Sequence, residues 1–188
     1  MSAGGKDWAP EFNRRIAGTM IAAHGTRFVE VSAERAVLEL DFRPELTQMT
    51  GLFHAGAIIS LADEACTALA SVHAMGDGGW DPERFPLTVQ LSANLIRNTT
   101  RGTITAEALP LHKGRTTVVV QSAVKDDQGR LLATVTATQI VRAATLGACL
   151  TNLRSSAGFA GAILSLVGEA SEGAVEAPSD LLGPVPSS

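Results

Sequence analysis

The 188-residue sequence predicts an α+β fold in which one curved antiparallel sheet wraps around one long central helix. Apolar and polar residues alternate along the chain both before and after its middle, and this period of two is typical of strands. Between these regions, residues 55–73 are apolar or small almost all round, which is typical of a buried helix. Because one helix covers only one face of a sheet, we expect at least a dimer.

The expected elements follow one another in a simple order. Apolar residues at four-residue intervals from Trp8 predict an amphipathic helix over 7–24. Alternation over 28–31 and 37–42 predicts a β-hairpin, and Pro44 ends its second strand. After the buried helix and a loop rich in Gly and Pro, four strands joined by turns form an expected antiparallel meander, over 87–96, 103–111, 115–125 and 131–142.

Composition divides the chain into three parts. Residues 1–26 form a helical lead-in, and residues 27–142 carry the patterned strands and the buried helix. In residues 143–188 roughly half of the side chains are Ala, Gly or Ser, and charges are few. We expect this extension to be partly helical or disordered, with docking to a partner as the alternative.

Charge and cysteine content exclude several classes of protein. The 15 basic and 19 acidic side chains give a net charge of -4, which argues against nucleic acid as a partner. Two cysteines, Cys66 and Cys149, make no disulfide framework, and no Cys/His cluster has zinc spacing, so we expect no metal and no cofactor. The charged N-terminus and the lack of about 18 successive uncharged apolar residues predict a cytoplasmic protein without a membrane partner.

Asp63 is the first candidate for chemistry, because a buried helix seldom carries a carboxylate that is neither paired nor used. Thr67 lies one turn further along the same face and adds a second polar group to an apolar stripe. Glu64 should point about 100° away and is the less favoured base. Cys66 is expected to be a small core residue, since no activating base has suitable spacing.

The start of the buried helix, His54-Ala55-Gly56, is the second candidate. The first N–H groups of a helix have no internal acceptor and can hold a developing oxyanion. Ala55 and Asp63 are eight residues apart in one helix, which places them about 12 Å apart along its axis. If both act on one carbonyl, they must come from two subunits with antiparallel helices.

Gln48, His54-Ala55-Gly56 and Asp63 together have the spacing of a known motif. With the strands that follow, residues 28–142 resemble the hotdog fold, and within it the acyl-CoA thioesterases of the phenylacetate-pathway type. The sequence departs from the family pattern at Ala55, where the family usually has a glycine. A backbone N–H is needed there, so alanine is compatible with the role.

The resemblance implies hydrolysis of an acyl-CoA by a homodimer or a tetramer, with Asp63 as general base or as nucleophile. It implies that Ala55 donates its amide to the thioester oxygen and that Gln48 orients the carbonyl or the water. Thr67 and Thr88 would hold water or the carboxylate. His54 would shape the start of the helix, with a role as base as the alternative. The expected contacts to the CoA phosphates are Arg97, Arg101, His112, Lys113 and Arg115, and those expected in the acyl tunnel are Ile58, Ile59 and Leu61.

Three other functions remain open at this point. The same fold occurs in modules that bind acyl-CoA or lipid without catalysis, but these carry a DNA-binding domain that the sequence before residue 27 does not provide. A hydratase or dehydratase would need a His and an acid side by side, and His54 stands apart from the acids. A scaffold would act through residues 143–188.

Overall fold

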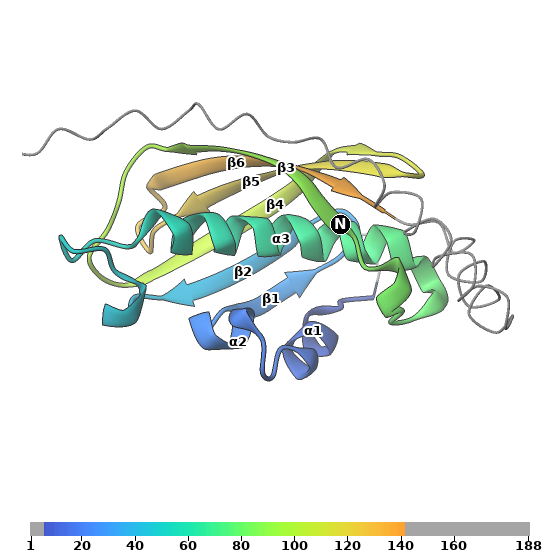
Figure 1. Cartoon of the computed structure of the whole chain (residues 1–188), viewed down its shortest axis with the longest axis horizontal. Coiled ribbons are helices and arrows are strands. Elements are labelled where there is room, and N and C mark those ends of the chain that lie inside the picture. The colour runs from blue at the N-terminus through green and yellow to red at the C-terminus, as the bar shows by residue number, and fades with distance from the viewer. Residues whose placement is uncertain (1–5, 142–188) are drawn as a thin grey trace, which may run out of the picture. The chain divides into compact units, whose positions relative to one another are not determined.

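Six antiparallel strands form one sheet that curves around a single long helix in the computed structural model, which describes residues 6–141 (Figure 1). This confirms the predicted fold class. The helices are α1 (Ala9–Arg15), α2 (Met20–His24) and α3 (Ala55–Met75). The strands are β1 (Arg27–Val31), β2 (Ala36–Asp41), β3 (Leu87–Leu95), β4 (Thr103–Lys113), β5 (Thr117–Lys125) and β6 (Leu131–Ile140).

The strand order β1-β2-β4-β5-β6-β3 differs from the predicted meander, because β3 pairs with β6 and not with β4. Beyond the end of β3, the amides of Ile96 and Arg97 both donate to the Leu132 carbonyl, at 2.8 and 3.0 Å. The chain then passes the start of α3, where the Asn98 amide group donates to the Phe53 carbonyl at 2.9 Å, before it enters β4. Turn residues predict that strands are connected, but they do not say which strands are neighbours.

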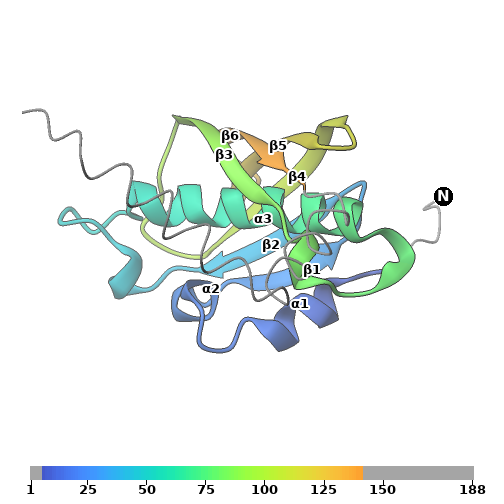
Figure 2. The same ribbon diagram turned by 45° about the vertical axis from the view of Figure 1, so that its right-hand side comes forward.

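Helix α3 forms the core around which the sheet wraps (Figure 2). Leu61, Ala62 and Ala70 are fully buried on different sides of the helix, as its apolar composition predicted. By length and composition alone, an 18-residue stretch within Ala55–Gly78 is also apolar enough to cross a membrane, with a mean hydropathy of 1.4. In the fold, 61% of its apolar stretch is buried, as expected of a core helix.

The lead-in forms two short helices, so the single helix predicted over 7–24 is wrong. Gly18 adopts a φ of 77°, in the left-handed region, and separates α1 from α2. Trp8 and Phe12 are buried as predicted, but Met20 is 59% exposed because the chain has changed direction. A four-residue period therefore predicted only the first of the two helices.

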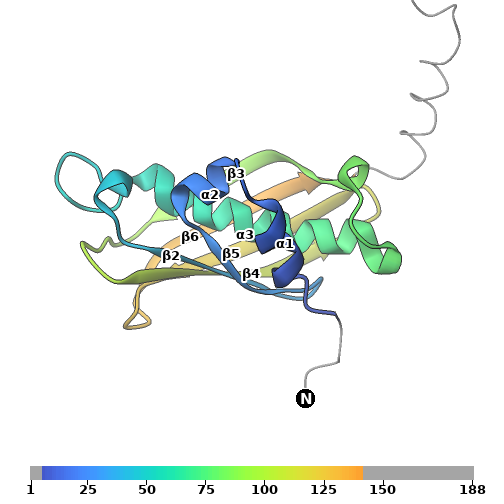
Figure 3. The same cartoon turned by 90° about the horizontal axis from the view of Figure 1, so that it is seen from below.

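The lead-in covers one edge of the sheet (Figure 3). The Trp8 amide donates to the Val31 carbonyl at 2.8 Å, and the Asp7 carboxylate accepts from the Val31 amide at 2.9 Å. Further along β1, the Asn13 side chain donates to the Phe28 carbonyl and accepts from its amide, at 2.8 and 3.1 Å. At the opposite edge, within residues 6–141, β3 is hydrogen-bonded only to β6.

The alternation predicted for the last strand is confirmed. Ala133, Val135 and Ala137 on β6 are fully buried against α3, with Thr residues between them on the other face. Gln139 continues the buried face and is also 0% exposed. A buried amide among small apolar side chains needs polar partners.

Candidate active site

The Asp63 carboxylate lies at one end of a hydrogen-bonded row that crosses from α3 to the sheet. Its Oδ1 is 2.9 Å from the Thr88 hydroxyl, which is 3.0 Å from Oε1 of Gln139. The Gln139 amide nitrogen donates to the Thr67 hydroxyl at 3.1 Å. Thr88 and Gln139 are paired residues on β3 and β6, so the sheet register places this row.

The row can serve either protonation state of Asp63. Thr88 has one hydroxyl proton and can donate to Asp63 or to Gln139, but not to both at once. An ionised Asp63 only accepts, so Thr88 donates to it and the Gln139 amide turns to offer its nitrogen to Thr88. A protonated Asp63 donates to Thr88, which then donates to the Gln139 oxygen.

Burial raises the pKa of Asp63 above its ordinary value, and hydrogen bonds from Thr88 and Gln139 counter part of the rise. A carboxylate with a raised pKa is a better acceptor for a proton from water. The side chain is half-buried on the face of α3 that looks toward β3. Its geometry therefore suits a general base.

Glu64, the next residue, faces the lead-in, as its helical offset predicted. Its Oε1 is 4.0 Å from Nδ1 of His24, and its side chain is only 8% exposed. Burial raises the pKa of Glu64 to about 7, the Thr26 hydroxyl lowers it in part, and the Asp63 charge adds to the rise. Two adjacent carboxyls thus face different surroundings.

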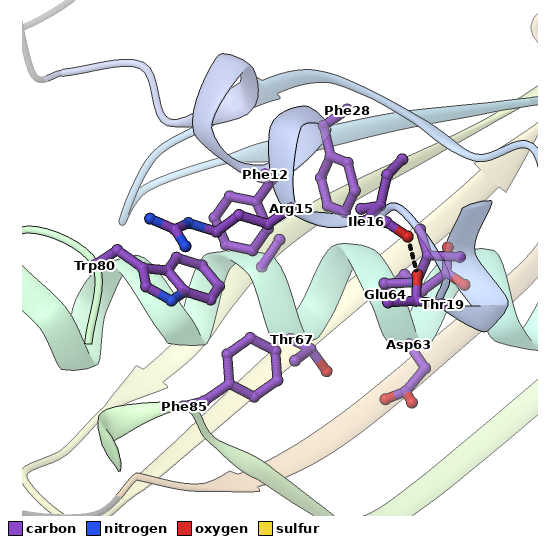
Figure 4. A pocket seen from close by; sticks show the side chains of 12 residues that line it. Phe12, Arg15, Ile16, Thr19, Phe28, Asp63, Glu64, Thr67, Trp80 and Phe85 are labelled. Atoms are coloured by element: carbon purple, nitrogen blue, oxygen red, sulfur yellow. Dashed lines mark hydrogen bonds between the residues drawn. The ribbon is translucent and has the colours of Figure 1, made fainter. Parts of the chain in front are cut away.

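A cavity of about 330 Å³ lies beside Asp63, Glu64 and Thr67, between α3 and the lead-in (Figure 4). Its walls are aromatic: the Phe12 ring stacks on Phe28 with centroids 5.0 Å apart and meets Trp80 edge-on at 5.4 Å. The remaining lining residues are Arg15, Ile16, Thr19, Ile21, Ala68 and Phe85. The cavity is therefore an apolar space with a carboxylate at its side.

The predicted acyl-tunnel residues do not line this cavity. Ile58 and Leu61 are 1% and 0% exposed and pack in the core, and Ile59 is partly exposed. Ile58 and Leu61 lie on other faces of α3 from Asp63 and Thr67, whereas Ile59 lies one turn before Asp63 on the same face, outside the cavity lining. Apolar character marks core and ligand-lining residues alike, so sequence could not separate the two groups.

At the start of α3, His54 caps the helix. Its Nδ1 accepts from the Gly56 amide at 2.9 Å, as expected of a structural role. A Cβ on Gly56 would lie 3.0 Å from that nitrogen, so a glycine permits the close approach. The Ala55 amide meets no acceptor among residues 6–141. Among the described residues, the Ala55 amide is therefore free to donate to a ligand.

Gln48 lies near this same end of the molecule, in the loop before α3. Its amide N–H donates to the Leu52 carbonyl at 2.9 Å, and its side-chain nitrogen donates to the Thr50 hydroxyl at 2.9 Å. Within one chain, Ala55 is about 12 Å along the helix axis from Asp63 and about 18 Å from Thr67. One chain does not bring the two groups together.

The five predicted phosphate contacts fall at two places. Arg97 and Arg101 follow β3 and lie on the loop that passes the start of α3. The other three lie at the far end of β4, whose 11 residues span about 35 Å. The predicted turn at 112–114 starts later, because β4 continues to Lys113, which forms an ion pair with Glu34. His112, Lys113 and Arg115 therefore form no single patch with Arg97 and Arg101 within one chain.

Sequence reasoning missed two parts of the site. Gln139 lies in the predicted strand 131–142 but was not predicted as a site residue, although a lone amide between apolar side chains was a usable signal. The aromatic wall from the lead-in and from Trp80 carried no signal, because these residues are far apart in sequence. Cys66 is fully buried and burial raises the pKa of its thiol, which agrees with the predicted core role. Cys149 and the extension 143–188 lie outside the described residues.

Comparison with known proteins adds independent information. A family model described as "Thioesterase superfamily" matches residues 50–133. A proposed esterase of Bacillus subtilis is 32% identical over 114 residues, which are 61% of this chain and 86% of the relative. The 1,4-dihydroxy-2-naphthoyl-CoA hydrolase of Listeria monocytogenes is 26% identical over 108 residues, 57% of this chain and 83% of the relative. A thioesterase from Haemophilus influenzae has a similar structure, with a TM-score of 0.64 at 18% identity over 71% of this chain and 90% of that one.

The His54 cap predicts a measurable contribution to stability. His54→Ala removes the acceptor for the Gly56 amide and should lower the free energy of unfolding by about 1 kcal/mol. His54→Asn keeps an acceptor at the cap and should lose much less. Urea denaturation of the three proteins measures the difference. Equal losses in both variants would contradict a capping role.

Glu64 predicts a pH dependence of stability. Its pKa rises from an ordinary 4.5 to about 7 on folding, so the folded state holds the extra proton between these values. The free energy of unfolding should therefore fall as pH rises through this window, by about 3 kcal/mol from this group. Glu64→Gln should remove that slope. Urea denaturation of wild type and Glu64→Gln at pH 5 and pH 8 measures the free energy of unfolding of each protein. The same change with pH in both proteins would refute the predicted role of Glu64.

Proposed function

The chain belongs to the thioesterase superfamily and has its hotdog fold, which supports thioester hydrolysis as its general activity, and we propose that the thioester is an acyl-CoA. The observation that carries the proposal is Asp63: a half-buried carboxylate with a raised pKa, held by Thr88 beside an apolar cavity. The similarity to a hydrolase whose named substrate is an acyl-CoA supports the choice of thioester.

In this proposal Asp63 acts as general base. It removes a proton from water as the water oxygen attacks the thioester carbonyl, and the CoA thiolate leaves. Thr88 and Gln139 hold the carboxylate, and Thr67 extends the row that can follow its change of protonation. Burial of Asp63 raises its pKa and so strengthens it as a base.

We assign the developing oxyanion to the Ala55 amide of a second copy of the chain. Within one chain this amide is about 12 Å along the helix from Asp63, so a second, antiparallel α3 would have to supply it. The amide suits the role because it lies at the positive end of a long helix and its neighbour Gly56 is already bonded to His54. Gln48 would approach the same carbonyl from the loop before that helix.

The edge strand β3 is the surface we propose for the second copy. Leu91 and Leu95 are paired with buried β6 residues, so they face the α3 side of the sheet, yet they are 39% and 46% exposed. The lead-in already covers the other edge, at β1. Pairing of two β3 strands would continue the sheet and cover this apolar face.

We propose separate binding places for the acyl group and for the CoA phosphates of the substrate. A cavity of about 330 Å³ is at the small end of the range for small-molecule sites, and aromatic walls favour a compact acyl group with a ring or a branch. For the CoA phosphates we propose Arg97 and Arg101, because their loop passes the start of α3, where the oxyanion donor is. Lys113 is a weaker candidate, since Glu34 neutralises it.

Asp63→Asn is the direct test of the activity. It keeps the shape and a hydrogen-bonding group but removes the base, and should lower kcat by about 100-fold or more. Release of free thiol from aliphatic and aromatic acyl-CoAs measures the effect, with Asp81→Asn at a surface turn as the matched control. Absence of turnover by the folded wild type on every thioester would refute the activity. Equal turnover by Asp63→Asn would refute the role of Asp63.

Leu95→Glu tests the two-copy site. A charge on the exposed face of β3 should convert dimers to monomers and reduce thioester hydrolysis by the same fraction. Val29→Glu, at a 48% exposed position on β1, should leave the dimer intact. Light scattering after size-exclusion chromatography measures the state of both variants. A monomer that retains full hydrolysis would contradict a site shared by two copies.

A further inference from the structure

The cavity beside Asp63 is closed more firmly on one side than on another. Phe12 and Phe28 form its wall on the lead-in side and are each 5% exposed, so protein surrounds them. Trp80 and Phe85, from the segment that follows α3, also line the cavity but are only partly buried. A side chain that lines a cavity and is still partly exposed has solvent on its other side. The ring of Trp80 therefore lies between the cavity and solvent.

Trp80 and Asp63 lie at opposite ends of the cavity lining, with Thr67 and Phe85 between them (Figure 4). Asp63 is in the middle of α3, whereas Trp80 follows the end of that helix at Met75. Thr67, one turn after Asp63, is the next lining residue in the same direction. An acyl group with its carbonyl at Asp63 would thus extend past Thr67 toward the indole ring.

Side chains from two segments hold the indole ring of Trp80 in place. Phe12 of α1 meets the ring edge-on at 5.4 Å between centroids, and Phe85 lies 5.9 Å away at a tilt. The Arg15 guanidinium lies over the ring, with its carbon 4.7 Å from the ring centroid. Glu11 in turn holds the guanidinium, through an ion pair of 2.6 Å. These contacts join α1 to the segment after α3 at the end of the cavity opposite Asp63.

We propose that Trp80 is a specificity-determining residue whose indole ring closes the cavity opposite Asp63 and limits the length of the acyl group. The inference rests on the proposed function of the same cavity and names the substrate feature that the cavity selects. Each methylene group buried in an apolar cavity strengthens binding by about fourfold. Binding should therefore improve with chain length until the chain meets the ring. A longer chain would have to displace the ring from its stack.

Arg15 is a positioning residue in this proposal, because it holds the ring that the acyl group meets. A cation–π contact at a partly exposed site stabilises the ring enough to change its displacement by about two- to fivefold. Arg14, the preceding residue, provides a matched control. It forms an ion pair with the same Glu11, but its side chain is 71% exposed and does not line the cavity.

Hydrolysis of straight-chain acyl-CoAs from butanoyl-CoA to decanoyl-CoA tests the role of Trp80. The measured quantity is kcat/KM for decanoyl-CoA divided by kcat/KM for hexanoyl-CoA. Trp80→Ala should raise this ratio about 10-fold or more, because two more buried methylene groups at about fourfold each already exceed that factor. Trp80→Phe and Arg15→Met should each raise it about threefold. Arg14→Met should leave it at the wild-type value.

An unchanged ratio in Trp80→Ala would overturn the proposal, as would an equal loss of hydrolysis at every chain length, which a purely structural role would produce. Trp80→Phe keeps an aromatic ring in the stack, so an unchanged ratio in Trp80→Phe and Arg15→Met would overturn the proposal if Trp80→Ala fails to fold.

The proposed function is judged separately, by thiol release from the wild type. If the wild type hydrolyses none of these thioesters, calorimetric dissociation constants for decanoyl-CoA and hexanoyl-CoA replace kcat/KM in the ratio. A change of that binding ratio in Trp80→Ala would support the role of Trp80 while the activity is refuted. An unchanged binding ratio would refute both.

Discussion

Helix α3 must be buried on nearly every side, and the rest of the molecule depends on this constraint. A curved sheet can wrap a helix closely only if the helix surface is made of small and aliphatic side chains, as in the run from Ala55 to Met75. Two adjacent acids, Asp63 and Glu64, interrupt that surface, and burial raises the pKa of both. The cavity lies beside both side chains, His24 of the lead-in faces Glu64, and Thr88 of β3 is hydrogen-bonded to Asp63.

The two carboxyls show how one helix can create two environments within a single step along the chain. Asp63 is supported by Thr88, and through it by Gln139 and Thr67, so its ionised and protonated forms both have partners. Glu64 is buried beside Thr26 and faces His24 across 4.0 Å, and burial favours its protonated form. A carboxyl with partners for both protonation states suits repeated proton transfer, whereas one that burial keeps protonated does not. The difference follows from about 100° of rotation around the helix.

Local patterns in the sequence predicted most elements, and long-range neighbours account for what it could not predict. The buried helix and the strand alternation follow from periodicity, and Asp63 was recognisable because a carboxylate is rare in an apolar helix. The place of β3 beside β6 depends on pairing between residues about 50 positions apart, such as Thr88 and Gln139, which no turn sequence encodes. The role of Gln139 was hidden for the same reason. The lead-in was read as one helix because a four-residue period does not register the left-handed backbone at Gly18.

The two edge strands of the sheet, β1 and β3, differ in how many hydrogen-bonding groups they leave free for a strand of another chain. Asp7, Trp8 and Asn13 occupy hydrogen-bonding groups of β1, so another chain finds few free groups there. Within residues 6–141, β3 is hydrogen-bonded to another strand on one side only, and the second copy proposed above would pair with its other side. A sheet with two open edges can add copies without limit, which leads to fibres, whereas a sheet with one open edge can join only one other of its kind. Because the lead-in covers β1, the pairing proposed at β3 would end with two copies and would not continue into a fibre.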